Sequence, residues 1–253
     1  MAPGYRAPMR KALIEIAGRY GKAKVEHLLP RHIAADLKDR PAGPRNARLK
    51  AWRALLNFGV DEAWIVTSPA ALIRRSSTPK TDGFLRIPRD AKKKFRQHWP
   101  QGTPQRTAFE VISWTGARCV DACRLGRQMI DAQGFLCFTQ RKTGGGVEIP
   151  ISQAPLNEPF LRAEHEHLIE AMKHVGEMQF IVTKHGKPRS QKGLSQWLSR
   201  AMNEAGIDPR YSAHGLRKAR AAELAELGWS SKRIAAWTGH ESLSVVLVNT
   251  RSA

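Results

Sequence analysis

The sequence is poor in cysteine and in acidic residues, and it contains no long hydrophobic run. Its three cysteines, Cys119, Cys123 and Cys137, are an odd number without the paired spacing of a zinc site. Neither a disulfide framework nor a metal centre is therefore predicted, and the thiols are interpreted as core residues in a reducing compartment. No segment reaches the roughly 18 apolar residues of a transmembrane helix, and the amino terminus lacks the apolar core of a signal peptide. We expect a cytoplasmic protein without a metal or other cofactor, and with no membrane partner.

The shortage of acidic residues leaves the chain strongly basic. Lys and Arg number 42 against 22 Asp and Glu, which gives a formal net charge of +20, and 42% of the residues are hydrophobic, enough for a folded interior. Each phosphate neutralised by Lys or Arg releases counterions, so this excess favours a polyanion as partner. With 7% aromatic residues, the chain lacks the stacking platform typical of single-strand RNA readers. Double-stranded DNA is the predicted partner, and a basic surface without a polyanion role is the alternative.

Apolar residues recur three and four positions apart through most of the chain, which predicts a mainly helical protein. Over residues 7–65 the pattern indicates several short helices, with the breakers Pro41, Gly43 and Pro44 before the longest one. Residues 68–89 mix Pro, Ser, Thr and Gly with basic residues, as a linker does. We therefore expect a helical amino-terminal domain of residues 1–80 and a second domain of residues 81–253.

Basic residues on the long helix and near the linker are the first candidates for DNA contact. Charges on one helix face or on an exposed segment can lie against successive phosphates. Each of them is equally well explained as a solvated surface charge. The candidates are Arg45, Arg48, Lys50 and Arg53 on the predicted helix, Arg74 and Arg75 in the linker, and Lys218 in the second domain.

Four short motifs of the second domain carry residues suited to chemistry at a phosphate. In TGARCVD, Arg118 stands at the predicted start of a helix, where a planar guanidinium suits two phosphate oxygens. The segment FLCFTQRKTGGGVEIPI predicts a small antiparallel sheet of two strands, with Lys142 in the Gly-rich turn. In HGLRK, His214 and Arg217 share one face at a helix start. A further histidine, His240, stands in TGH. An imidazole that moves a proton beside a guanidinium that stabilises charge fits a phosphodiester site.

Two of these residues have simpler explanations when they are taken singly. Arg118 is equally well explained as a surface arginine paired with Asp121, and Lys142 as a solvated lysine in a turn. No carboxylate cluster accompanies the motifs, so metal-assisted hydrolysis is poorly supported.

The four motifs, in this order, resemble the catalytic domain of the tyrosine recombinases, the phage integrase family. The resemblance runs from about residue 90 to the end, and the helices before it resemble that family's core-binding domain. It implies a two-domain clamp on duplex DNA in a bacterial or phage setting, associated with the nucleoid. Arg118 and Arg217 would hold the scissile phosphate, Lys142 would be the general acid, and His214 and His240 would assist proton transfer. Asp121 matches a supporting acidic residue.

The resemblance departs from the family at the nucleophile. The attacking tyrosine follows the second histidine motif by nine residues, and Asn249 occupies that position here. A carboxamide nitrogen is delocalised into its carbonyl and cannot form the covalent ester with DNA. The tyrosines of the chain are Tyr5, Tyr20 and Tyr211, and the last of these precedes His214 in a loop where a phenol is better suited to packing. We expect a sequence-specific DNA-binding protein that is inactive in strand cleavage, with a regulatory role in transcription or in a mobile element.

Two alternatives remain open at this point. A partner recombinase that donates its tyrosine in trans would make the chain part of a site-specific recombinase or integrase. The chain is otherwise explained as an inactivated copy of an active integrase. The resemblance is also compatible with self-association on DNA and with DNA-bending proteins as further partners.

Overall fold

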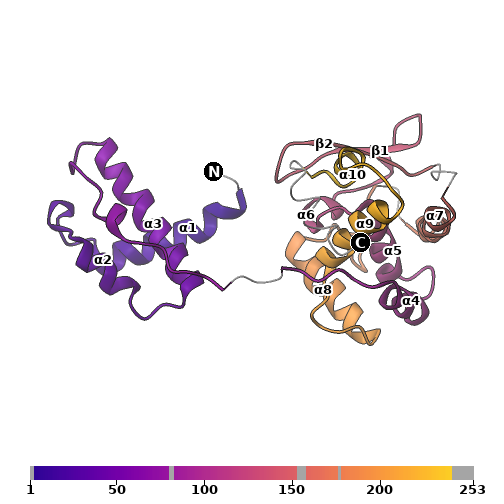
Figure 1. Cartoon of the computed structure of the whole chain (residues 1–253), viewed down its shortest axis with the longest axis horizontal. Coiled ribbons are helices and arrows are strands. Elements are labelled where there is room, and N and C mark those ends of the chain that lie inside the picture. The colour runs from indigo at the N-terminus through magenta and orange to yellow at the C-terminus, as the bar shows by residue number, and fades with distance from the viewer. Residues whose placement is uncertain (1–2, 80–82, 153–157, 176–177, 241–253) are drawn as a thin grey trace. The chain divides into compact units, whose positions relative to one another are not determined.

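The chain divides into two compact units, Met1–Thr81 and Asp82–Ala253, in the computed structural model (Figure 1). The structure describes residues 3–79, 83–152, 158–175 and 178–240. This part of the chain is mainly helical and carries one antiparallel sheet of two strands, which confirms the predicted secondary-structure content. The division between the units falls inside the segment predicted as a linker.

Over residues 3–79, the first unit is built from three α-helices and two 3-10 turns around a small apolar core. Its elements are α1 (Pro3–Tyr20), η1 (Val25–His27), α2 (Pro30–Leu37), α3 (Ala42–Asp61) and η2 (Pro69–Leu72). The longest helix starts earlier than predicted, because Gly43 and Pro44 lie in its first turn. The missing N–H of a proline costs little there, since the first amides of a helix have no intrahelical acceptor.

A buried carboxylate, that of Asp36, lies in the interior of the first unit and determines where Arg48 lies. Asp36 accepts hydrogen bonds from Nε of Arg48 at 2.7 Å and from Nε1 of Trp52 at 2.8 Å. Burial alone would raise the pKa of Asp36, but the hydrogen bonds and the positive charge of Arg48 outweigh it and lower that pKa. The prediction that Arg48 lies on a DNA-facing surface is wrong. Its side chain is 4% exposed because it neutralises a buried acid.

Two residues of α3 that were predicted to contact DNA instead hold the segment that follows the helix. Arg45 donates to the carbonyl of Arg74 at 3.1 Å and to Oγ of Ser76 at 2.8 Å. Arg53 donates from Nη2 to the carbonyl of Ile73 at 2.7 Å. Residues 69–76 therefore belong to the first unit, and the linker was predicted to begin too early. Three other candidates, Lys50, Arg74 and Arg75, are exposed.

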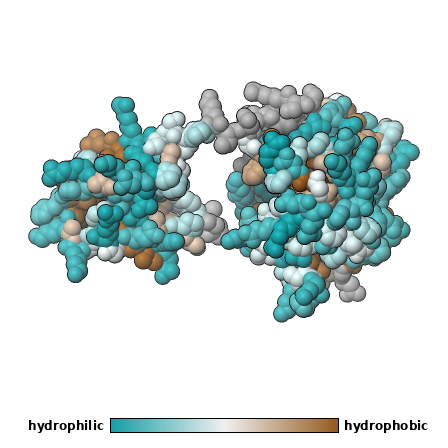
Figure 2. Space-filling view, turned by 90° about the horizontal axis from the view of Figure 1, so that it is seen from below, coloured by the Kyte–Doolittle hydropathy of each residue, from teal (hydrophilic) through white to brown (hydrophobic). Residues whose placement is uncertain are grey.

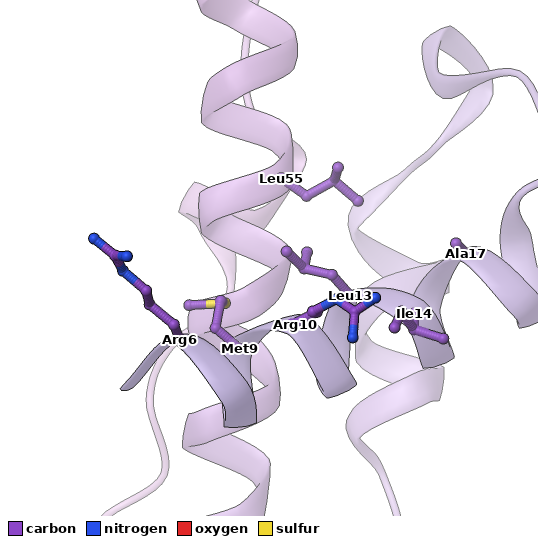
Figure 3. Close-up of a pocket in the computed structure, with 7 residues that line it drawn as sticks. All are labelled: Arg6, Met9, Arg10, Leu13, Ile14, Ala17 and Leu55. Carbon is purple, nitrogen blue, oxygen red and sulfur yellow. The ribbon is translucent and has the colours of Figure 1, made fainter. Parts of the chain in front are cut away.

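Apolar side chains lie on the surface of the first unit. A hollow of about 520 Å³ opens between α1 and α3, where Leu55 of α3 faces the apolar side of α1 (Figure 3). Its lining is Arg6, Met9, Arg10, Leu13, Ile14, Ala17 and Leu55. Hydrophobic patches are visible on this unit in Figure 2, whereas the face of the second unit in that view is mostly hydrophilic.

The second unit packs helices around a central buried helix, α5. Its elements are α4 (Arg89–His98), α5 (Pro104–Thr115), α6 (Cys119–Ala122), η3 (Arg127–Met129), β1 (Phe135–Thr139), β2 (Gly146–Pro150), α7 (Pro159–Met172), α8 (Gln191–Glu204), α9 (Ala213–Glu226) and α10 (Ser231–Thr238). Helix α5 is buried from Arg106 to Thr115 and contacts α7, α8 and α9. In the hairpin, Leu136 pairs with Ile149, and α10 packs against β2 (Figure 1).

A cluster of buried charges connects α4, α5, α7 and α9. Lys92 donates from Nζ to Glu164 at 3.0 Å and to Glu223 at 2.6 Å, and Glu164 also accepts from Arg96 and Arg220. Burial alone would raise the pKa of Glu164, but the charges of Lys92 and Arg220 hold it well below its usual range. Because α9 carries three of the predicted site residues, His214, Arg217 and Lys218, this cluster also fixes the helix on which they stand.

The three cysteines are unpaired, but only one of them is a fully buried core residue. Cys123 is buried, whereas Cys119 and Cys137 are half-buried. Burial raises the pKa of Cys119 to about 11, so its thiol stays protonated. Within the described residues there is no helix long and apolar enough to cross a membrane and no His, Cys, Asp and Glu group arranged to hold a metal ion.

Candidate anion-binding site

Two Thr-Gly pairs end helices in the same way and form the floor of the site. Gly116 ends α5 at φ 61° and Gly239 ends α10 at φ 66°, the left-handed conformation that glycine adopts without strain. Thr115 donates its hydroxyl to the carbonyl of Val111 at 2.6 Å, and Thr238 bonds one turn back within α10 at the same distance. Each motif is therefore a helix-ending turn that presents the residues after it.

Arg217 connects these two turns from α9. Its Nη1 donates to the carbonyl of Gly116 at 2.8 Å and to the carbonyl of Thr238. The side chain is 1% exposed, and among the described residues its Nη2 has no hydrogen-bond partner. Burial, followed by repulsion from Arg118, lowers the pKa of Arg217 to about 9. The guanidinium is thus still charged near pH 7, and its buried Nη2 is a donor without an acceptor among the described residues.

Arg118 reaches the same turns through a residue that the sequence analysis missed. Its Nη1 donates to Oε1 of Gln140 at 2.8 Å, and Nε2 of Gln140 donates to the carbonyl of Thr238 at 3.3 Å. The helix that follows Arg118 is a single turn, so the guanidinium itself, and not a helix dipole, supplies the positive charge. Gln140 stands directly after β1 and is 3% exposed. A polar residue at the end of an alternating strand was the only available signal.

Asp121 is a buried acidic residue whose charge acts on Arg217. It is 1% exposed, and its Oδ1 accepts a hydrogen bond from the backbone nitrogen of Arg141 at 2.9 Å. Its charge offsets part of the lowering of the pKa of Arg217. The surface pair between Arg118 and Asp121 considered from the sequence is not what the structure shows, since Arg118 donates to Gln140 instead. Among the described residues, the charge of Arg217 is therefore opposed by Asp121 and reinforced by Arg118.

The two histidines are held neutral beside these charges. His214, in the first turn of α9, has its pKa lowered to about 4 by burial and by the charges of Arg217, Lys218, Arg118 and Lys142. His240 has its pKa lowered to about 3 by burial and by Arg217 and Arg118.

The hydroxyl of Thr238 also sets the tautomer of His240. This hydroxyl has one proton, which it gives to the carbonyl of Ile234 at 2.6 Å. The 2.6 Å contact between Oγ1 of Thr238 and Nδ1 of His240 must therefore be donated by the ring. Neutral His240 consequently carries its lone pair on Nε2, where it can accept a hydrogen bond or a proton.

Comparison with known proteins identifies the family. The sequence pattern of the phage integrase family matches residues 90–253. The chain belongs to the phage integrase family.

Relatives within this family are identical to the chain at about a quarter of the aligned positions. Tyrosine recombinase XerC of Halalkalibacterium halodurans is 25% identical over 216 residues, which cover 80% of this chain and 69% of XerC. XerC of Natranaerobius thermophilus is 26% identical over 248 residues, covering 90% and 78%.

Solved structures confirm the fold. A lambda integrase (75-356) dimer bound to a COC′ core site superposes with a TM-score of 0.77 at 22% identity, over 98% of this chain and 87% of that one. A lambda integrase tetramer bound to a Holliday junction superposes with a TM-score of 0.72 at 23% identity, over 88% and 65%. The predicted resemblance to the family is confirmed by the family match over residues 90–253.

Some of the motif residues are connected by hydrogen bonds, and others only by electrostatic interaction. Hydrogen bonds bring Arg118, Arg217 and the turn before His240 together. His214 and Lys142 are connected to them by charge, and Lys142 is exposed in the hairpin turn. Asn249 lies outside the described residues. Lys218 is half-buried next to the site on α9, while the candidates on α3 and after it lie in the other unit.

Proposed function

We propose that this phage integrase family member binds duplex DNA by holding a backbone phosphate between Arg118 and Arg217, and that it does not cleave the strand by itself. The observation that carries the proposal is the proximity of two guanidinium groups, one of them buried, where Asp121 is the carboxylate that acts on the buried one among the described residues. A bound phosphate supplies the missing negative charge and an acceptor for Nη2 of Arg217. Planar guanidinium forks match phosphate oxygens better than ammonium groups do.

Duplex DNA is the proposed form of this phosphate for two reasons. The net charge of +20 favours a long polyanion over a single phosphate. The similar lambda integrase structures are described as bound to a core site and to a Holliday junction. In this proposal the first unit is the core-binding domain, with Lys50, Arg74 and Arg75 on phosphates, and the two units form a clamp. Self-association on DNA belongs to the same proposal.

The proposed loss of cleavage rests on Asn249. The family match extends through residue 253 and so includes this position. A carboxamide is not a nucleophile toward phosphorus, and removing the nucleophile of a covalent mechanism leaves only binding and electrostatic stabilisation. Tyr211 does not replace it in this proposal, because its ring packs partly buried against the core of the second unit. Tyr5 and Tyr20 belong to the first unit.

Relaxation of a negatively supercoiled plasmid tests the absence of cleavage without knowledge of the target sequence. The unaltered chain is expected to relax no plasmid and to form no covalent adduct, and cleavage by Asn249→Tyr would show that the remaining site is intact. Asn203→Tyr, an exposed position on α8, is the matched control and is expected to stay inactive. Relaxation by the unaltered chain overturns the proposal of inactivity.

Binding is tested separately by fluorescence anisotropy with a labelled duplex at several salt concentrations. The logarithm of the association constant is expected to fall with the logarithm of salt concentration, with a slope of about −0.9 for each phosphate neutralised. An association constant that does not change with salt contradicts the phosphate grip. Mapping the bound sites in a genome then tests the proposed regulatory role, because promoters and attachment-like repeats imply different functions.

A second function is favoured by the retained acid and base residues. Binding alone does not require a general acid such as Lys142 or proton transfer by His214 and His240. A partner that donates a tyrosine would use all three. Complementation tests this: the chain is mixed with a tyrosine-bearing family member that lacks its own first site arginine. Cleavage only in the mixture supports donation in trans, and no cleavage in any ratio rules it out for that pair.

A further inference from the structure

We infer that Gln140 is a positioning residue of the phosphate site, which holds Arg118 and the turn of Thr238 to His240 in one arrangement. The inference rests on the proposed function in one respect, since it assigns Gln140 a role in phosphate binding. Gln140 stands in the motif segment QRKTGGG, but the family resemblance assigned it no role, and it carries no charge of its own. Its importance follows only from the contacts that it makes.

The side-chain amide of Gln140 joins three segments that are far apart in the sequence. Oε1 accepts from Nη1 of Arg118 at 2.8 Å and from Oγ1 of Thr143 at 2.6 Å. Nε2 donates to the carbonyl of Thr238 at 3.3 Å. Thr143 directly follows Lys142, so the same amide also orders the hairpin turn that presents this lysine. One uncharged group thereby contacts three of the four motif segments.

The fourth motif segment, which contains Arg217, is connected through the carbonyl oxygen of Thr238. The carbonyl of Thr238 accepts from Nη1 of Arg217 as well as from Gln140. The two guanidinium groups of the site are therefore connected by a short path through Gln140 and one carbonyl. A carbonyl oxygen has two lone pairs, so it can accept both hydrogen bonds.

The packing around the amide leaves it little freedom to move. Gln140 is 3% exposed, and a Cβ at Gly239 would overlap both its amide group and a methyl of Val147. The turn that presents His240 thus lies directly on Gln140. Arg118 is only half-buried and has a long flexible side chain, so without this acceptor it would lose its fixed orientation. A phosphate would then have to order the arginine at the cost of affinity.

A double-mutant cycle separates this role from simple core packing. Gln140→Met keeps the length of the side chain and removes its hydrogen bonds. It is expected to weaken binding of a 30-base-pair duplex by about fivefold to tenfold, in the range of one ordinary hydrogen bond. In an Arg118→Ala background it is expected to change the affinity by less than about twofold, because its partner is already absent. Gln133→Met, at an exposed position before β1, is the control and is expected to leave binding unchanged.

Two outcomes of the cycle overturn the inference. In the first, Gln140→Met binds the duplex as tightly as the unaltered protein does. In the second, the loss of affinity caused by Gln140→Met is the same in the Arg118→Ala background as in the unaltered protein. Denaturant midpoints of all variants are measured in parallel, and the comparison is made among variants that are folded under the binding conditions.

A spectroscopic measurement keeps the inference testable if the protein does not bind duplex DNA at all. The charge of Arg118 contributes to the low pKa of His240, which NMR titration of the ring protons reports. If Gln140 orients Arg118, Gln140→Met raises the pKa of His240, and so does Arg118→Ala, with no further rise in the double variant. An unchanged pKa of His240 in Gln140→Met overturns the inference. If the unaltered chain binds no duplex but Gln140→Met raises the pKa of His240, only the proposed function is overturned.

Discussion

Nη1 of Arg217 donates to the carbonyl oxygen of Gly116 at 2.8 Å, across 101 residues of sequence. The same nitrogen donates to the carbonyl of Thr238, at the end of another helix. One buried guanidinium therefore fixes two helix-ending turns and keeps a second nitrogen available among the described residues. The arginine is at once a structural link and the proposed phosphate ligand, so its replacement should affect both properties.

Arg217→Lys should weaken duplex binding by about tenfold or more, because an ammonium group cannot contact two carbonyls and a phosphate in the planar geometry of a guanidinium. Anisotropy titration at fixed salt measures the change. Arg210→Lys is the matched control, since Arg210 is exposed and paired with Asp208, and it should bind like the unaltered protein. Equal binding by Arg217→Lys would show that no fork geometry is needed at this site.

Gly239→Ala should destabilise the second unit more than Gly206→Ala does. Both glycines have positive φ, 66° and 70°, and an L-residue in this conformation costs about 1–2 kcal/mol. Only at Gly239 would the added methyl also overlap Gln140 and Val147, whereas the space around Gly206 is open. Denaturant unfolding of the two variants gives the difference directly. Similar losses of stability would mean that the turn moves away from Gln140 at little cost.

Lys92→Met should lower the free energy of unfolding by about 3–5 kcal/mol, because it leaves the carboxylates of Glu164 and Glu223 buried with fewer cations. Lys93→Met, the adjacent residue on the same helix, should change it by less than about 1 kcal/mol, since its ion pair with Asp90 is exposed. Chemical denaturation of both variants measures the contrast. A neutral effect of Lys92→Met would mean that the methionine packs as well as the ion pairs do.

Stability should fall as the pH is lowered below about 6.5. The pKa values of His214 and His240 are lowered to about 4 and about 3 in the folded protein, from 6.5. Below pH 6.5 the unfolded chain therefore binds protons that the folded chain does not, so stability present above pH 6.5 is lost down to about pH 3. His214→Gln and His240→Gln should each flatten the pH dependence of the unfolding midpoint. His174→Gln, at an exposed position, should leave it unchanged.

Much of the fold was predictable because it depends on local patterns. The period of apolar residues predicted the helices of both units, and the alternating residues around the Gly-rich turn predicted the hairpin of β1 and β2. The motif residues Arg118, His214, Arg217 and His240 were selected by chemical type and spacing, and the structure brings their segments together. The assignment of Asn249 to the nucleophile position remains a prediction.

The sequence by itself determined where helices and strands form and which residue types are suited to a phosphate, since both depend on near neighbours and on side-chain chemistry. Only the tertiary structure decided that Arg48 neutralises the buried Asp36, that Arg217 connects two turns, and that Gln140 orients Arg118. The physical reason is that burial and hydrogen-bond partners are set by segments far apart in the chain. No local pattern shows which carboxylate, carbonyl or amide will lie next to a given arginine.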